Sequence, residues 1–346
     1  MMKERKTIPM VLRYIINIVL IAVFLTVLNL LVASKTLSIY NAKVLMLVGV
    51  NIILAVSLNV ATGYLGQLPL GHAGFMAVGA YVSAIFTKSF EGRLPDGVNF
   101  VLGLALAAVF AGLVGVLIGI PALRLQGDYL AILTLGFGEI IRITINNIDN
   151  VLGFKLTYGA AGLKNIPKYT SVLNTFVWVV ICCYVIHTMM KSRHGRAILA
   201  IRENEIAADS CGIQTTYYKV MGFAVSAAFA GVAGGLYAGY LGVLNPSTFG
   251  FMKSIEILVM VVLGGMGSML GSVLSATVLT ILPEALRSFS EYRMVVYALA
   301  LVLMMIFKPS GLLGQYDFSL SRLIEKVMNG ELLRKKSKTA KEGDKA

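Results

Sequence analysis

Residues 100–120 read FVLGLALAAVFAGLVGVLIGI and contain no charged side chain. The hydrocarbon core of a bilayer is about 30 Å thick, so a helix needs about 20 successive apolar residues to cross it. This stretch meets that length and predicts a transmembrane helix. Because similar apolar runs recur along most of the chain, it also predicts the class, an all-α polytopic membrane protein.

Further apolar runs flank this stretch, and the length argument predicts about ten membrane segments in total. The last runs before 290 are short, and they form either two spans or one interrupted pair. The flanking runs are 14–33, 44–62, 73–87, 129–145, 174–190, 220–241, 255–263, 270–282 and 294–307.

Composition agrees with residence in a membrane. Hydrophobic residues make up 57% of the chain and charged residues 14%, against roughly 25% charged residues in soluble domains. The net charge of +13 does not indicate a nucleic-acid partner, because the cations lie at the termini and in loops and are not interleaved with aromatic residues. Cationic ends of this kind predict contact with anionic membrane lipid.

The distribution of Lys and Arg predicts sidedness, because basic residues accumulate on the cytoplasmic side. The N-terminal segment 1–13 and the tail 308–346 are both basic. We therefore expect two cytoplasmic termini around a transmembrane domain over 14–307. The tail has few large apolar residues, and we expect it to be partly disordered.

Gly and Pro interrupt the apolar pattern at 63–72, which reads GYLGQLPLGH and is called the first break. Non-helical backbone at membrane depth is tolerated only where protein or a water-filled cavity surrounds it. The first break is therefore expected to line or hinge a path through the membrane; an ordinary tight connection is the alternative. Its candidate residues are Gly63, Gly66, Gln67, Gly71 and His72. No metal site is expected, because no second His or Cys accompanies the histidine.

A second break, 264–271, reads GGMGSMLG. Gly63 and Gly66 are three positions apart, as are Gly264 and Gly267. Paired interruptions of this kind indicate internal repeats around a central pathway. The candidate hinge residues of the second break are Gly264, Gly265 and Gly267.

The run at 129–145 contains Glu139 and Arg142, and Asn146 follows it. On a helix the two charged residues are i,i+3 neighbours that pair. Charges within a span are costly and face protein or a cavity. The pair is therefore either a pathway or gating element, or a structural contact between helices.

The polar segment 191–219 is expected to be a cytoplasmic loop that carries a short helix over 196–212. Strong helix formers dominate its middle, and Gly212 stands where a C-terminal cap is expected. In this interpretation Arg196, Arg202, Glu203 and Glu205 orient the helix on a partner protein. A solvated helix without a partner is the alternative.

Residues 205–212, EIAADSCG, resemble the coupling loop of ABC importer permeases, in which two alanines, here Ala207 and Ala208, precede a glycine. The family's glutamate directly precedes the alanines, whereas Ile206 intervenes here. The chain as a whole resembles the LivM-type permeases of branched-chain amino acid importers. The segments that carry this resemblance are 63–81, 127–142, 193–212, 263–271 and 308–314.

The resemblance implies an ABC-importer permease fold in the plasma membrane of a prokaryote, importing leucine, isoleucine and valine. The implied partners are a second, LivH-like permease subunit, two cytoplasmic ABC ATPase subunits and an extracytoplasmic substrate-binding protein. The chain lacks a G-x-x-x-x-G-K-[S/T] phosphate loop and a catalytic constellation. It is therefore not expected to be an enzyme or to hold a cofactor. Urea, short amides or other amino acids are alternative cargoes, and an ion-coupled secondary transporter that uses Glu139 is the alternative from another class.

Overall fold

The structure is a computed structural model, and it describes residues 26–30, 38–125 and 127–289. It also describes residues 292, 295, 296, 298, 299, 302, 306, 307, 311 and 312. In this part of the chain the regular elements are all helices, and an isolated bridge joins Leu163 to Leu244. The all-α prediction is confirmed for these residues. The predicted N-terminal segment 1–13 and nearly all of the tail 308–346 lie outside them.

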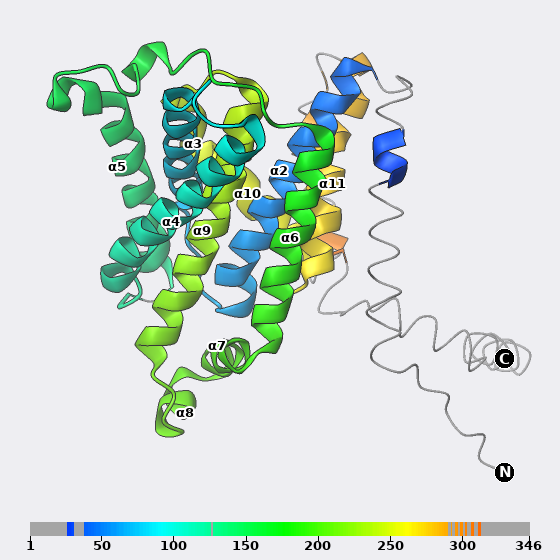
Figure 1. Cartoon of the computed structure of the whole chain (residues 1–346). Coiled ribbons are helices and arrows are strands. Elements are labelled where there is room, and N and C mark those ends of the chain that lie inside the picture. Colours follow the sequence, from blue (N-terminus) through cyan, green and yellow to red (C-terminus); the bar gives the residue numbers. More distant parts are fainter. Residues whose placement is uncertain are drawn as a thin grey trace, which may run out of the picture.

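The main helices follow the predicted apolar runs from 44 to 282 (Figure 1). In chain order they are α2 Ile39–Asn59, α3 His72–Ser89, α4 Asp96–Ala122, α5 Asp128–Leu152, α6 Val172–Lys191, α7 Arg193–Glu203, α8 Glu205–Ser210, α9 Thr215–Leu241, α10 Phe251–Gly264 and α11 Met269–Ala285. Shorter pieces are the π-helix η1 Val60–Tyr64 and the 3-10 turns η2 Gly159–Ala161, η3 Pro246–Phe249 and η4 Leu286–Phe289.

Four helical stretches in the described residues are long and apolar enough to cross a membrane: Ile39–Tyr64, α4, α6 and α9. The helix α11 is apolar but shorter. The predicted runs 14–33 and 294–307 lie largely outside the described residues. A multi-pass membrane protein is therefore supported, while the count of ten spans and the sidedness stay predictions.

The helix α9 lies at the centre of the bundle, packed against α2, α3 and α4. Small residues allow this close contact. A Cβ atom added at Gly231 of α9 would lie 2.5 Å from the carbonyl oxygen of Ala107 in α4. Without a hydrophobic drive between helices in lipid, such backbone proximity is a main source of helix association.

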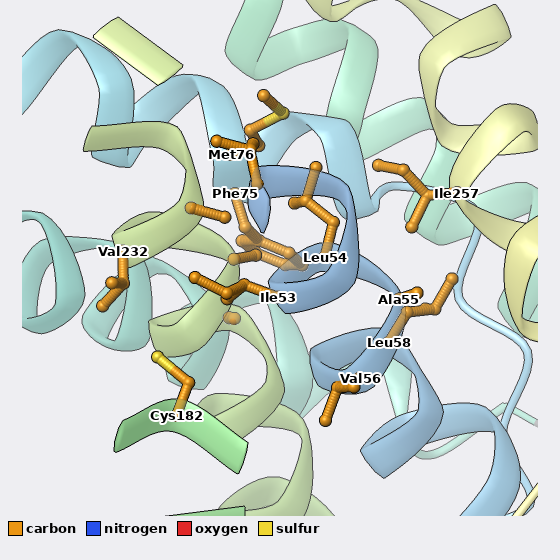
Figure 2. Close-up of a cluster of buried hydrophobic side chains, with 14 of the residues drawn as sticks. Ile53, Leu54, Ala55, Val56, Leu58, Phe75, Met76, Cys182, Val232 and Ile257 are labelled. Atoms are coloured by element: carbon orange, nitrogen blue, oxygen red, sulfur yellow. The ribbon is translucent and has the colours of Figure 1, made fainter. Parts of the chain in front are cut away.

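The helix α2 is enclosed by the bundle, and all its residues from Val48 to Asn59 are buried. Figure 2 shows Ile53, Leu54 and Leu58 of α2 among side chains from α3, α6, α9 and α10. A helix that is apolar on every side is expected in such a buried position. The end of α2 therefore places Gly63, where the first break begins, inside the bundle.

Candidate coupling site and membrane breaks

The segment 191–219 forms two helices, so the prediction of one continuous helix over 196–212 was wrong. Asn204 has an extended backbone (φ −158°, ψ 107°), which ends α7. Its side-chain Oδ1 accepts a hydrogen bond of 3.0 Å from the amide of Ala207 and caps α8. Asparagine is a favoured N-cap because its oxygen satisfies an amide that has no partner within the helix.

The end of α8 has the predicted glycine cap. Gly212 has a φ of +81°. Its backbone amide donates a hydrogen bond of 2.9 Å to the carbonyl oxygen of Asp209, and the backbone amide of Ile213 donates one of 3.1 Å to the carbonyl oxygen of Ala208. These two bonds form a Schellman motif, which requires a left-handed residue that glycine adopts without strain.

The helix α7 is anchored in the bundle, whereas α8 projects beyond it, at the bottom of Figure 1. Ile198 and Ile201 of α7 are 0% and 4% exposed. In α8 the side chain of Ile206 is 80% exposed, and Ala207 is exposed beside it. The loop therefore combines a fixed helix with an accessible tip.

The charged residues predicted to face a partner differ in whether they bond within their own chain or remain exposed. Arg202 donates from Nη1 to the carbonyl oxygen of Gly63 at 2.7 Å and from Nη2 to Glu203 at 2.6 Å. Arg196 donates to the carbonyl oxygen of Lys191 at 3.2 Å. The Glu203 side chain remains 71% exposed. Arg202 thus contacts the first break inside its own chain.

Glu205 forms an ion pair with Lys219 of α9, with 2.5 Å between Oε1 and Nζ. The Lys219 side chain is only 5% exposed. Sequence reasoning missed this lysine because a cation near the start of a span looks like an ordinary interfacial residue. Its burial is visible only once α9 and α8 are placed together.

The two Gly-rich breaks meet in space. The amide of Gly267 donates to Oδ1 of Asn59 at 2.8 Å. A Cβ atom added at Gly63 would lie 2.1 Å from the nitrogen of Gly267, and one added at Gly267 would lie 3.2 Å from Nη1 of Arg202. The structure thus joins both breaks and α7 at one junction, defined by Gly63, Gly267, Asn59 and Arg202. Asn59, which is fully buried, was not predicted.

The rest of the second break is also tightly packed. Gly265 has a φ of +100° at the end of α10. Gly264 and Gly271 lie so close that a Cβ atom on either would overlap the other's carbonyl group. The amide of Leu312 donates to the carbonyl oxygen of Leu263 at 2.7 Å, which brings the segment around 311 to this break.

The other residues of the first break differ in exposure: Gly66 is exposed, Gln67 is half-buried, and Gly71 and His72 are buried. Gly66 has a φ of +74°, and a Cβ atom there would lie 2.8 Å from Cγ of Arg202. Gln67 is half-buried, and its backbone amide donates a hydrogen bond of 2.9 Å to the carbonyl oxygen of Ala61.

At the end of the first break, Gly71 packs on the backbone of α5, where its Cβ would lie 2.1 Å from the carbonyl oxygen of Thr134. His72 is 1% exposed, with Nε2 2.9 Å from Oγ of Ser57. In the described residues no group of three or more His, Cys, Asp or Glu side chains is arranged to hold a metal ion.

Glu139 and Arg142 form the expected pair, with 2.7 Å between Oε2 and Nε. The other carboxylate oxygen of Glu139 accepts a hydrogen bond of 3.1 Å from the amide of Phe251, the first residue of α10. The pair therefore joins α5 to α10. Asn146 lies one turn further along α5, and its carbonyl oxygen packs against Gly159.

The helical bundle has four stretches in the described residues that are long and apolar enough to cross a membrane, as in a multi-pass membrane protein. The family match assigns this protein to the permease class. The chain belongs to the family described as branched-chain amino acid transport system / permease component, whose sequence model matches residues 40–307. Within that family it is a LivM-type permease.

Two LivM permease proteins of high-affinity branched-chain amino acid transport systems, from Salmonella typhimurium and Escherichia coli, are each 38% identical over 296 residues. Each match covers 76% of this chain and 67% of the relative. The LivH permease protein of Escherichia coli is 26% identical over 281 residues, which cover 76% of this chain and 91% of LivH. No solved structure matches the chain.

Proposed function

We propose that this chain is the transmembrane permease subunit of an ATP-driven importer of leucine, isoleucine and valine. Its partners would be a LivH-like permease, two cytoplasmic ABC ATPase subunits and an extracytoplasmic binding protein. The names of the LivM and LivH relatives support the cargo and the pairing. The proposed setting is a prokaryotic plasma membrane, with ten spans and both termini in the cytoplasm.

One observation carries this proposal: an exposed α8 sits on an anchored α7, and α7 contacts the first break through Arg202. The projecting surface suits a partner that pushes from outside the bundle. An internal contact made by Arg202, at the end of α7 that adjoins α8, suits transmission of that push. This chain would therefore receive the motion that ATP hydrolysis on its partners produces.

The proposed mechanism is alternating access. Closure of the ATPase subunits displaces α8, and α7 receives the displacement because Asn204 alone separates the two helices. Ile198 and Ile201 of α7 are buried in the bundle and pass the displacement on to it. The junction of Arg202 with Gly63 and Gly267 then shifts both breaks together. The glycines act as joints, because Gly66, Gly265 and Gly267 have positive φ angles that glycine adopts without strain.

The proposed path runs beside these joints, with Gln67 and His72 as nearby polar groups and Asn146 further along α5. Glu139 lines a small pocket together with Gly74, Phe249 and Ser254, and Arg142 is its ion-pair partner. Polar groups in a membrane protein face protein or a water-filled cavity. Substrate selectivity would rest mainly on the binding protein that delivers the cargo.

Reconstitution tests the proposal. The full chain is placed in proteoliposomes with the LivH-like subunit and the binding protein, with or without the candidate ATPase subunits of the source organism. We expect uptake of labelled leucine only when ATPase subunits and ATP are both present, and unlabelled valine should compete where urea does not. Uptake by the chain alone, driven by a proton or sodium gradient, would contradict the proposal.

A further inference from the structure

We propose that Glu205 and Lys219 form a positioning pair that sets the orientation of α8, and that Glu205 affects the ATPase only through this pair. The inference rests on the proposed function. Glu205 is the first residue of α8, and Lys219 lies near the start of α9. Their charged atoms are 2.5 Å apart.

The burial of Lys219 makes this pair a constraint on α8. Its side chain is 5% exposed, while that of Glu205 is 36% exposed. An ammonium group removed from water is strongly unfavourable unless a counter-charge accompanies it. If α8 turned away from α9, the buried charge would lose that partner. The pair therefore ties α8 to the transmembrane helix that follows it.

The helix α8 has few other anchors. It has six residues, and Ala208 is its one buried side chain. Isolated helices of this length are not stable in water. Besides the cap from Asn204, the ion pair is thus the main contact that fixes which side of α8 faces outward. Since neighbouring residues on a helix point about 100° apart, a carboxylate turned toward Lys219 leaves Ile206 outward.

This geometry gives Glu205 and Ile206 different roles. The carboxylate of Glu205 is engaged inside the chain, and the accessible surface of α8 consists of Ile206, Ala207, Asp209 and Ser210. We therefore assign docking to this outward surface and orientation to the pair. A glutamate that touched the ATPase directly would act independently of Lys219.

A double-mutant cycle separates these possibilities. Glu205→Gln, Lys219→Met and the double variant are made in the full chain and assembled with the partner permease. The dissociation constant for the ATPase subunits and the number of leucine molecules imported per ATP are then measured. We expect each single variant to weaken association about ten-fold and the double variant to be no worse, because two residues that act as a unit are not additive.

Two further changes test whether the charges themselves matter. Lys219→Arg keeps the charge and should retain an association constant close to that of the wild type. The exchanged pair, Glu205→Lys with Lys219→Glu, should recover most of the loss caused by Glu205→Lys alone. This second test does not depend on whether Lys219→Met folds. The matched control is Lys253→Met with Glu256→Gln, which removes a 3.0 Å ion pair within α10. It should change neither the ATPase dissociation constant nor the number of leucine molecules imported per ATP.

Multiplied effects in the double variant, about 100-fold, would show that Glu205 acts on the ATPase directly and would overturn the inference. So would single variants that associate normally, or an exchanged pair as weak as Glu205→Lys. If the wild-type complex does not bind the ATPase subunits at all, the proposed function fails, and the inference fails with it. If the wild type associates normally and the variants are unaffected, only the inference about the positioning pair is refuted, and the proposed function stands.

Discussion

The guanidinium of Arg202 donates a hydrogen bond from Nη1 to the carbonyl oxygen of Gly63 at 2.7 Å, across 139 positions of sequence. Its aliphatic stem also packs against Gly66, whose missing side chain leaves the space for it. In the proposed mechanism this is the contact that carries a displacement of α7 to the first break. Substitution of Arg202 should therefore affect transmission more than docking.

Arg202→Lys tests this transmission. Lysine keeps the charge but has a single ammonium in place of the planar fork, so it cannot hold Gly63 and Glu203 in the same geometry. We expect ATPase association within about two-fold of the wild type and leucine uptake per ATP reduced about ten-fold. Arg124→Lys, at an exposed residue between α4 and α5, is the control and should transport normally. Equal loss in both variants would argue against a special role for Arg202.

Gly267→Ala tests the junction between the breaks. Gly267 has a φ of +89°, and an added Cβ would meet Arg202 at 3.2 Å. A left-handed conformation costs an ordinary residue roughly 1–2 kcal/mol, so the thermal midpoint of the purified permease should fall. Gly136→Ala is the matched control. Gly136 lies inside α5 with open space around it, and alanine there should stabilise the helix by up to about 1 kcal/mol. A midpoint that does not fall in Gly267→Ala would show that this close contact is not maintained.

Asn204→Ala tests the cap that separates α7 from α8. Loss of an asparagine N-cap costs about 1 kcal/mol, and it would also favour continuation of α7 into α8. We expect weaker association with the ATPase subunits, measured by co-purification. Ser171→Ala removes an analogous cap from α6, where Oγ accepts from Asn174 at 3.3 Å, at the other end of that helix from the loop. This control should lower stability by a similar amount without affecting association.

Glu139→Gln decides between the two interpretations of the charged pair in α5. The carboxylate bonds both Arg142 and the first amide of α10, which supports a contact that joins helices. We expect a lower thermal midpoint and unchanged leucine uptake per inserted molecule. Loss of uptake at an unchanged midpoint would instead place the pair on the path. Glu256→Gln, from a pair whose carboxylate is 43% exposed, should change neither.

The sequence was sufficient for features that depend on local pattern. The run at 100–120 falls within α4, since length and apolarity alone decide a membrane-spanning helix. Gly212 caps α8 as expected, because a Schellman motif needs a left-handed residue at that position. The separation of α7 from α8 at Asn204 is also a local feature, but it was not predicted because helix-forming residues lie on both sides of it.

Contacts between distant segments were not predictable in this way. The bond between Asn59 and Gly267 spans 208 positions, and nothing in either segment specifies the other. Lys219 carries no sequence signal of burial either, because its environment comes from the placement of α8 against α9. Such contacts follow from the packing of the whole bundle. The candidate residues were therefore found more readily than their partners.

The most direct test of the central claim measures the accessibility of the first break while the ATPase subunits hydrolyse ATP. A single cysteine replaces Gln67 in a chain whose Cys182, Cys183 and Cys211 are changed to Ser, and its labelling rate is measured in the assembled complex with and without ATP. We expect ATP to change this rate at least several-fold, and we expect Arg202→Lys to abolish the change while ATPase binding persists. A rate that does not respond to ATP in an actively transporting complex would contradict coupling between α8 and this break.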